Sequence, residues 1–404
     1  MVRAGRVHRL AHEAATYGTR VADVRLDWSA VIARQRAIVA ALQPPVDKLE
    51  GAGVRVHLGE VRFADDHTLA VGGARVRGER IIIAAGSEAV VPPIPGVSLA
   101  ITSSELLFLP AFPERLVLIG AGAIGLEMAS AFNHLGAAVT VIAQEPEIFP
   151  AVDADVGAYA RTTLEARGVT FLLGARVTAL GGRPGEVTID VEVAGARRSL
   201  TASVVCLAAG RRWYPRSLGA ESLGLETGRL GLKTSRYLRT SVPHIYAAGD
   251  AAGNVQLTPT AAYEGKLAAA NALDGDRVAS DLSVVPQAIF TTPEIARVGL
   301  THREAMERNV GCHVSTHDMR GASNGVASGE EGGYLKLVFE PATERVLGVQ
   351  MVSWAGAELI QLAALAIRGG ATAGQLSTQL SVHPSHAERL IKVAAHEFHD
   401  VCEV

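Results

Sequence analysis

One segment constrains the fold of this chain more than any other part of its sequence. An apolar stretch at 116–119 is followed by three glycines with the spacing Gly-x-Gly-x-x-Gly, and a second apolar stretch comes at 138–142. In a strand–turn–helix–strand unit, the first glycine permits a tight turn and the second lets the backbone approach a pyrophosphate. The third lets helix and strand pack closely, while helix N–H groups meet the phosphate. The sequence therefore predicts a dinucleotide-binding loop, against the alternative of a glycine turn without a ligand. Its residues are Gly120, Gly122, Ala123, Ile124 and Gly125.

Length and composition set the class of the chain. At 404 residues it is too long for one ordinary core, so two or three domains are expected. Hydrophobic residues make up 48% and charged residues 20%, which is typical of globular rather than disordered proteins. A net charge of −3 gives no reason to expect nucleic acid as a partner. No apolar run approaches the roughly 18 residues that a membrane span needs, so we expect a cytoplasmic location and no membrane partner.

The end of the second strand of the nucleotide unit bears on the choice between NADH and NADPH. An acidic residue there would bind the ribose 2′-hydroxyl, and an arginine would favour the 2′-phosphate. Ala143 and Gln144 stand at this position, with Glu145 next. Because no carboxylate stands where it would repel the phosphate, NADPH is slightly favoured, and both nucleotides remain open.

Cysteines and histidines form no local metal or redox motif. Cys206, Cys312 and Cys402 are far apart, so reduced and buried thiols are expected. Some histidines are paired at helical spacing and would share a helix face. No third ligand accompanies them, so surface histidines and no metal are expected. The pairs are His8/His12, His383/His386 and His396/His399.

Periodicity predicts the secondary structure on both sides of the nucleotide unit. One helix is expected over 3–17, and a second from about residue 27 to the two prolines at 44–45. Period-two alternation then predicts short antiparallel strands, with a turn at the glycines 72–73. These strands are expected at 54–58, 61–63, 68–71 and 75–77.

Several short motifs lie in a recognisable order along the chain. Residues 80–87 are an apolar strand ending in glycine and serine, and residues 245–250 are a strand ending on an aspartate. With the glycine loop, Ala-Ala-Gly-Arg at 208–211, Leu-Thr-Pro at 257–259 and His-Pro-Ser-His-Ala-Glu at 383–388, the whole chain resembles one family. That family is the pyridine nucleotide-disulfide oxidoreductases, which include dihydrolipoamide dehydrogenase, glutathione reductase and mercuric reductase.

The resemblance implies a fold and a set of cofactors. The expected fold is α/β, with two Rossmann-like dinucleotide-binding domains, the first of them incomplete, and a C-terminal α+β dimerisation domain that forms a homodimer. FAD and NAD(P)H are the implied cofactors. The implied domains are 1–105 (FAD-binding, first part), 106–215 (NAD(P)-binding), 216–283 (FAD-binding, second part) and 284–404 (dimerisation).

The resemblance also assigns cofactor contacts. Asp250, after Gly249, is expected to hydrogen-bond the flavin ribityl chain, against the alternative of an ordinary strand-end turn. A helix starting at 256–259 is expected to direct its N-terminal dipole at the flavin pyrimidine. Gly210 would close the nicotinamide pocket, and Glu127 would lie near the nicotinamide and flavin rings. The other implied contacts are Ala85, Gly86, Ser87, Gln256, Leu257, Thr258 and Pro259.

His383 and Glu388 match the family's catalytic dyad. There a histidine from the other subunit, oriented by the glutamate, carries a proton for a substrate thiol, a role that suits a group titrating near neutrality. The alternative is a solvated loop histidine before a helix. The family's mercuric reductases lack this histidine and carry paired C-terminal cysteines, so its presence argues against mercuric ion as the substrate.

The family's first glycine-rich unit and its Cys-x-x-x-x-Cys pair have no counterpart in this sequence. Since a strand–helix–strand unit needs about 30 residues or more, we expect that about 40–50 residues lie upstream and that Met1 is an internal methionine. The alternative is a truncated relative that binds nucleotide and dimerises without flavin chemistry.

The sequence therefore predicts an enzyme, an FAD- and NAD(P)H-dependent disulfide oxidoreductase most similar to dihydrolipoamide dehydrogenase. Its substrate would be a small-molecule or protein-bound disulfide. A nucleotide-binding dimer without flavin chemistry is one alternative, and a flavin-linked transhydrogenase or quinone reductase, which needs no thiols, is another.

Overall fold

The computed structural model divides into two compact units, each built from separate stretches of sequence. Among the described residues, none of the helices is long and apolar enough to cross a membrane. The first unit comprises 1–33, 91–209 and 283–404, and the second comprises 34–90 and 210–282. The described residues are 1–43, 45–330, 332–395 and 400–402.

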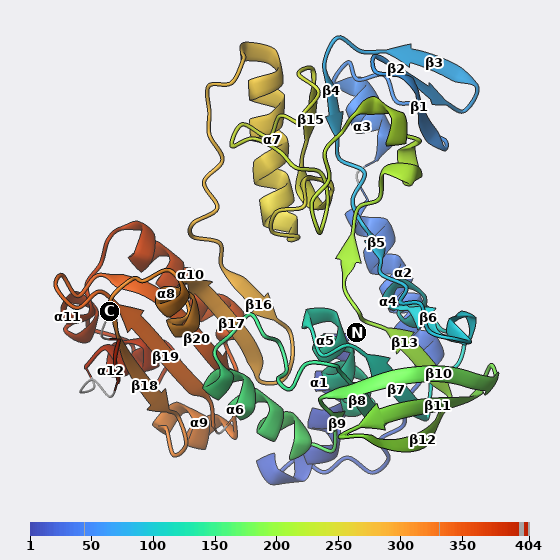
Figure 1. Cartoon of the computed structure of the whole chain (residues 1–404). Helices are drawn as coiled ribbons and strands as arrows, with labels where there is room; N and C mark the ends of the chain where they lie inside the picture. The colour runs from blue at the N-terminus through green and yellow to red at the C-terminus, as the bar shows by residue number, and fades with distance from the viewer. Residues whose placement is uncertain (44, 331, 396–399, 403–404) are drawn as a thin grey trace. The chain divides into compact units, whose positions relative to one another are not determined.

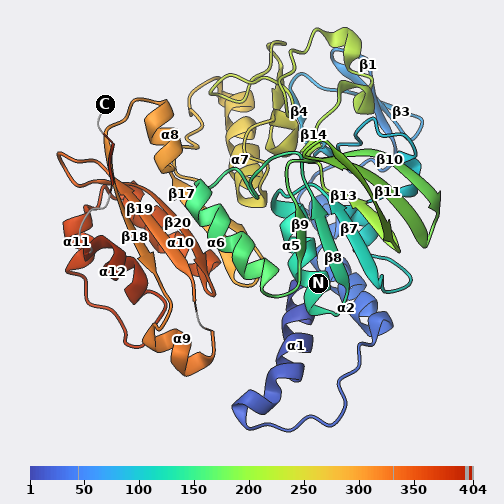
Figure 2. The same cartoon turned by 60° about the horizontal axis from the view of Figure 1, so that its bottom comes forward.

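In the first unit, the glycine-rich segment lies in a five-stranded parallel sheet with the order β6-β13-β7-β8-β9 (Figure 2). Helix α5 (Ala123–His134) connects β7 to β8, as the glycine spacing predicts. The predicted Rossmann-like unit is therefore confirmed. The strands are β6 (Ile101–Thr102), β7 (Arg115–Ile119), β8 (Ala138–Ile142), β9 (Thr170–Leu172) and β13 (Val204–Leu207), with α4 (Ser103–Leu106) and α6 (Ala154–Glu165) between them.

Both faces of this parallel sheet are covered. An antiparallel sheet of β10 (Ala175–Arg183), β11 (Glu186–Val193) and β12 (Ala196–Ala202) forms one apolar cluster with β7 and β13. On the other side, α5 packs against α1 (Val2–Glu13), so closely that a Cβ on Gly5 would lie 2.9 Å from the Ala131 carbonyl oxygen. Burial on both faces explains why these strands are continuous apolar runs.

The C-terminal part of the first unit is a six-stranded antiparallel sheet with the order β16-β17-β20-β19-β18-β21 (Figure 1). Helices α10 and α12 contribute to its apolar cluster, which gives the α+β module that the sequence predicts. The strands are β16 (Gln287–Ile289), β17 (Glu294–Gly299), β18 (Cys312–Asp318), β19 (Tyr334–Phe339), β20 (Val346–Ser353) and β21 (Asp400–Cys402). The helices are α8 (His302–Glu307), α9 (Ser323–Ser328), α10 (Gly356–Arg368), α11 (Ala373–Ser377) and α12 (Glu388–Ala395).

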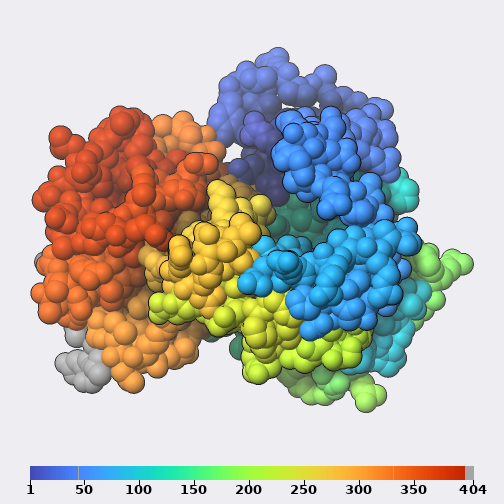
Figure 3. All heavy atoms as spheres, turned by 90° about the horizontal axis from the view of Figure 1, so that it is seen from above, coloured from blue at the N-terminus to red at the C-terminus, as the bar shows by residue number. Residues whose placement is uncertain are grey.

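The second unit is formed by two segments that lie side by side in the space-filling view (Figure 3). Strands β4 and β15 pair in parallel and bury isoleucines and alanines in its core. A three-stranded antiparallel sheet and the pair β5/β14 complete its strands. The elements are α3 (Val46–Gly51), β1 (Val61–Asp65), β2 (Thr68–Val71), β3 (Ala74–Arg77), β4 (Ile81–Ile83), β5 (Glu88–Ala89), β14 (Arg211–Arg212), β15 (Ile245–Ala247) and α7 (Thr258–Asp274). Helix α2 (Trp28–Leu42) contributes residues to both units.

Two expectations about local structure are wrong. Residues 54–58 form no strand; Val54 and Leu58 are exposed, so their alternation marks no buried face. Cys312 was expected to be reduced but is disulfide-bonded. Cys206 is free and buried, and burial raises the pKa of its thiol to about 12. The side chain of Cys402 and the pair His396/His399 lie outside the described residues.

His134, at the end of α5, makes stability depend on pH. Burial, with the charges of Arg9 and Arg6, lowers the pKa of its imidazole to about 4. The unfolded chain therefore binds more protons than the folded one between pH 6.5 and 4, so stability falls as the pH is lowered through this window. Relative to His134→Gln, the native chain should lose about 3 kcal/mol between pH 7 and 4, as measured by urea unfolding. Parallel pH profiles for the two proteins would contradict this.

Candidate functional site

The glycine turn between β7 and α5 has the geometry of a phosphate site. Gly120 has a φ of +122°, and a Cβ there would lie 2.3 Å from the Ala208 carbonyl oxygen. A Cβ on Gly125 would lie 2.0 Å from the Gly120 carbonyl oxygen, so helix and turn touch at this point. A Cβ on Gly122, the residue before α5, would meet nothing within 4 Å. Space therefore opens at the helix N-terminus, beside Ala123 and Ile124, where N–H groups can meet a pyrophosphate.

Of the three residues that follow β8, the first is buried and the next two are exposed to solvent. Ala143 is buried in the apolar cluster, and its backbone bonds to Leu172 and Ala175. Gln144 and Glu145 are exposed. Of the two residues predicted to contact the nucleotide ribose, only Gln144 thus has a side chain available to a ligand.

Glu127, one turn into α5, is partly withdrawn from water. Its Oε1 accepts a hydrogen bond from the Phe290 backbone N–H at 3.1 Å. Burial raises the pKa of its carboxyl group, and the Phe290 bond offsets only part of this effect. A carboxyl group with a raised pKa close to a nucleotide turn is a candidate functional group.

In the second unit, the carboxyl ends of β4 and β15 bring two predicted residues together. Ser87 Oγ donates to Asp250 Oδ2 at 2.5 Å, and Arg211 Nε donates to Ser87 Oγ at 2.9 Å. Sequence reasoning missed Arg211 as a site residue, although it follows Gly210 in the quoted Ala-Ala-Gly-Arg motif. Ligands of α/β proteins bind beyond the carboxyl ends of parallel strands, which is where this cluster lies.

The start of α7 fits a bound group that accepts hydrogen bonds. Gly249 is held by Glu264, whose buried carboxylate accepts its N–H at 2.8 Å and whose pKa is raised by burial. The predicted residues 256–259 form the first turn of α7 and the residues before it. Gln256 Nε2 and Thr260 Oγ1 are buried there without hydrogen-bond partners among the described residues. Buried polar atoms are normally paired, so these two atoms are suited to contact a polar ligand such as the flavin.

The predicted dyad is formed in the first unit. His383 Nδ1 lies 2.8 Å from Glu388 Oε2, and the side chains are 65% and 8% exposed. Arg389, which is buried, donates from Nη2 to Glu388 Oε1 at 3.1 Å and to Asn324 Oδ1 at 2.7 Å. Burial acts to raise the pKa of Glu388, but the His383 hydrogen bond and the charge of Arg389 outweigh it and lower that pKa. The glutamate is therefore an ionised, fixed partner for an exposed imidazole.

The other histidine pairs lack a third ligand among the described side chains. His8 and His12 approach to 3.3 Å between their Nε2 atoms, while His386 bonds to Asn324 rather than to His383. One group that the sequence did not suggest, Asp66 with His67 and His244, brings potential ligand atoms within 4.8 Å. Its two imidazole rings are stacked at 3.8 Å between centroids, and the lone pairs of stacked rings point along separate planes. This geometry favours ring packing over shared ligation of one ion.

Comparison with known proteins identifies the class that this fold and these sites define. The family model "Pyridine nucleotide-disulphide oxidoreductase" matches residues 7–265, and the model of that family's dimerisation domain matches residues 285–394. The chain therefore belongs to the pyridine nucleotide-disulfide oxidoreductases. Members of this family are enzymes that use FAD and NAD(P)H.

Individual relatives have different substrates. The chain is 32% identical to a glutathione reductase of Burkholderia cepacia (94% of this chain, 84% of that protein). It is 31% identical to a dihydrolipoyl dehydrogenase of Chlorobaculum tepidum (98% and 86%). It is 30% identical to a mercuric reductase of Bacillus cereus (96% of this chain), of whose length it spans 63%.

A solved structure with the same fold is the HOCl-induced flavoprotein disulfide reductase RclA from Escherichia coli. It superimposes with a TM-score of 0.82 at 27% identity, over 96% of this chain and 88% of that one. The predicted family and fold class are confirmed by these matches.

Proposed function

We propose that this chain functions as an FAD-dependent NAD(P)H:disulfide oxidoreductase, most similar to dihydrolipoamide dehydrogenase, acting on a small-molecule or protein-bound disulfide. The single observation that carries this proposal is the His383–Glu388 hydrogen bond, with Glu388 held on its other oxygen by Arg389. A buried, ionised glutamate that orients an exposed histidine is the arrangement expected for proton transfer to a substrate. The match to the dimerisation domain supports a homodimer.

Each cofactor has candidate partners. Gly120, Gly122 and Gly125 would hold the NAD(P)H pyrophosphate at the start of α5, with Glu127 one turn further along. Asp250, Ser87 and the first turn of α7 would hold FAD. When bound, these two groups supply hydride transfer and the storage of two electrons.

The dyad would accept and donate protons while the disulfide is reduced. Reduction of a disulfide consumes two electrons and two protons and releases two thiols. With Nδ1–H donated to Glu388, the basic nitrogen of His383 is Nε2, which can carry a proton to a leaving thiolate. The ionised carboxylate stabilises the imidazolium that forms. Arg389 donates to the other oxygen of Glu388 and so holds the glutamate in place.

A flavin-linked transhydrogenase or quinone reductase is the second candidate function. The observation that favours it is that candidate contacts for both nucleotides are present, at the Gly120 turn and at the Ser87–Asp250 hydrogen bond. Such an enzyme would need both nucleotide sites and neither a thiol pair nor the dyad.

Substitution of His383 tests the proposal. The purified chain is first desalted with FAD, and retained flavin absorbance is expected. NAD(P)H oxidation is then followed with lipoamide or oxidised glutathione, and with a quinone for comparison. His383→Gln should lower disulfide turnover about 100-fold and leave quinone turnover unchanged, because the dyad would protonate only the leaving thiolate, whereas a hydroquinone can take its protons from water.

His57→Gln is the control, since it removes an exposed histidine outside the Asn324–Arg389–Glu388 hydrogen bonds and should retain disulfide turnover. Equal turnover of disulfides by His383→Gln and the native chain would refute the role of the dyad. Quinone turnover without disulfide turnover would favour the second candidate. A chain that retains no FAD would favour the nucleotide-binding dimer without flavin chemistry.

A further inference from the structure

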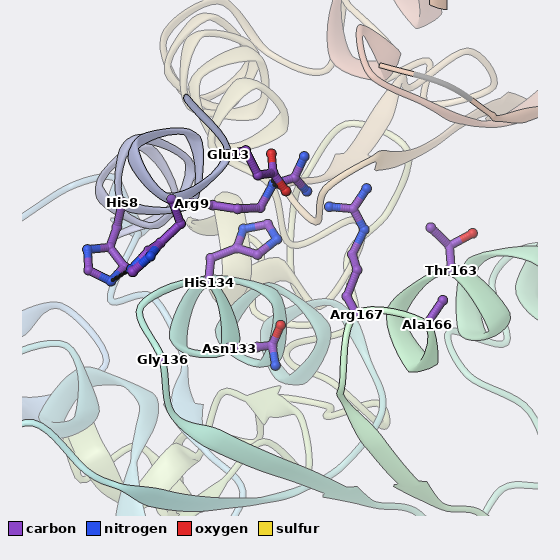
Figure 4. Close-up of a pocket in the computed structure, with 10 residues that line it drawn as sticks. His8, Arg9, Glu13, Asn133, His134, Gly136, Thr163, Ala166 and Arg167 are labelled. Atoms are coloured by element: carbon purple, nitrogen blue, oxygen red, sulfur yellow. Dashed lines mark hydrogen bonds and ion pairs between the residues drawn. The ribbon is translucent and has the colours of Figure 1, made fainter. Parts of the chain in front are cut away.

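A cavity of about 650 Å³ lies in the first unit, between α1, the end of α5 and the end of α6 (Figure 4). Its lining includes Arg9 and Glu13 from α1, Asn133 and His134 from α5, and Arg167 just after α6. Small-molecule sites have volumes of about 300–1,000 Å³. The cavity is therefore large enough for an organic ligand rather than a bare ion.

Two arginine side chains at this cavity pack on the same aromatic ring. The guanidinium carbons of Arg9 and Arg167 lie 5.3 and 5.2 Å from the ring centroid of the same tryptophan, Trp354. Arg9 is also bonded to Glu13, at 3.1 Å. Arg167 Nη1 is buried and has no hydrogen-bond partner among the described residues. A buried charged donor without a partner is costly, and a bound anion would remove that cost.

The helix ends at this cavity do not need the arginines as caps. The last carbonyls of α5 accept hydrogen bonds from the turn that follows: Asn133 O from Gly136 N, and Phe132 O from Ala137 N. The end of α6 closes in the same way, with Glu165 O accepting from Gly168 N. The Nη1 of Arg167, which is unpartnered among the described residues, is therefore left for a ligand.

The remaining groups leave the cavity positive. His134 is neutral at physiological pH, because burial and the nearby arginine charges lower its pKa to about 4. Arg6, which contributes to that effect, is paired with Glu294 at 2.8 Å. Glu13 is the one acidic side chain in the lining, against the two arginines. The excess of positive charge in the lining favours binding of an anion over a cation.

We propose that this cavity is a binding site for a small molecule bearing an oxyanion, a phosphate or a carboxylate, which Arg167 and Arg9 hold. The cavity is separate from the nucleotide turn, because it lies at the C-terminal end of α5 and the turn lies at the N-terminal end, about 18 Å along a twelve-residue helix. The fork of a guanidinium matches the two oxygens of either group. The stacking on Trp354 fixes both arginines in place.

Calorimetric titration tests this site. The probes are inorganic phosphate and 3-phosphoglycerate, added to the full chain at constant ionic strength, with chloride as the reference anion. We expect one equivalent of 3-phosphoglycerate to bind, more tightly than inorganic phosphate because it also fills the cavity. Arg167→Gln should weaken binding about 10-fold or more, the value of one charge-assisted hydrogen bond. Arg176→Gln removes an exposed arginine that is paired with Glu192 and should leave binding unchanged.

The variants also separate binding from folding. Arg167→Lys keeps the positive charge but loses the two parallel N–H donors of the guanidinium. This variant should therefore bind 3-phosphoglycerate with intermediate affinity, even if Arg167→Gln folds poorly. Binding that is equally strong in all the Arg167 variants would place the anion elsewhere, for example at the nucleotide turn, and would overturn the proposal. Failure of both probes to bind the native chain would overturn it as well.

Discussion

Replacement of Lys336 by methionine is expected to lower the free energy of unfolding by about 3–5 kcal/mol, because it leaves a buried carboxylate without its cation. Lys336 Nζ lies 3.2 Å from Asp153 Oδ2, and the two side chains are only 7% and 6% exposed. Asp153 also accepts hydrogen bonds from the backbone of residues 302 and 303 and from Gln350 Nε2 at 2.6 Å. This carboxylate thus connects the start of α6 to α8, β19 and β20.

Urea unfolding of the two proteins at pH 7 measures this effect. Lys233→Met is the matched control, because Lys233 is exposed and lies 3.7 Å from Glu226, where a surface pair contributes about 1 kcal/mol or less. The double variant Asp153→Asn/Lys336→Met should recover part of the loss, since it also removes the buried charge. A loss below 1 kcal/mol in Lys336→Met would mean that water reaches the Asp153 carboxylate.

The Asp153–Lys336 pair also predicts how the free energy of unfolding depends on pH. Burial acts to raise the pKa of Asp153, but the hydrogen bonds from Arg303 and Gln350 and the charge of Lys336 outweigh it and lower that pKa. The stabilisation is therefore present above the pKa of the carboxyl group in the unfolded chain and is lost as the pH falls through its folded value. The penalty of Lys336→Met should shrink over that acidic range.

Features encoded over short stretches could be predicted from the sequence. The turn at Gly120–Gly125 depends on the spacing of three glycines within six residues, and the bond from His383 to Glu388 joins side chains five residues apart. The glycine spacing predicts the turn, whereas the dyad is implied by the resemblance of the motif at 383–388 to the family. The order of motifs then identified the family, and with it the fold.

Features that depend on distant pairing could not be predicted. Gln350 contacts Asp153 across 197 residues, and Arg389 contacts Asn324 across 65. The period-two alternation at 54–58 predicted a strand with one buried face. Residues 54–58 form no strand, because a strand also needs a neighbouring strand to pair with, which the alternation does not reveal. Spacing along the chain likewise could not show that Arg211 reaches Ser87, 124 residues away.

Gly125→Ala is expected to abolish NAD(P)H binding and to destabilise the first unit, because helix and turn touch at this residue. A Cβ at position 125 would lie 2.0 Å from the Gly120 carbonyl oxygen and 3.4 Å from Ala208 Cβ. The oxygen belongs to the backbone of the turn, so relief requires α5 to move away from β7. Since the phosphate-binding N–H groups begin this helix, the same movement displaces them. Overpacking of this kind typically lowers the free energy of unfolding by about 1–3 kcal/mol. Because the contact with the backbone is so short, we expect a cost at or above the upper end of that range.

Two further glycines separate the effect on binding from the effect on folding. Gly122→Ala should leave the free energy of unfolding nearly unchanged, since its Cβ would meet no protein atom within 4 Å, yet weaken NAD(P)H binding by filling the approach to the pyrophosphate. Gly181→Ala, also with open space around it but in strand β10, should change neither quantity. Fluorescence titration with NADPH and NADH, beside urea unfolding of each variant, gives both measurements. Native affinity in Gly122→Ala would show that the nucleotide does not approach this turn, and native stability in Gly125→Ala would show that α5 can shift without loss.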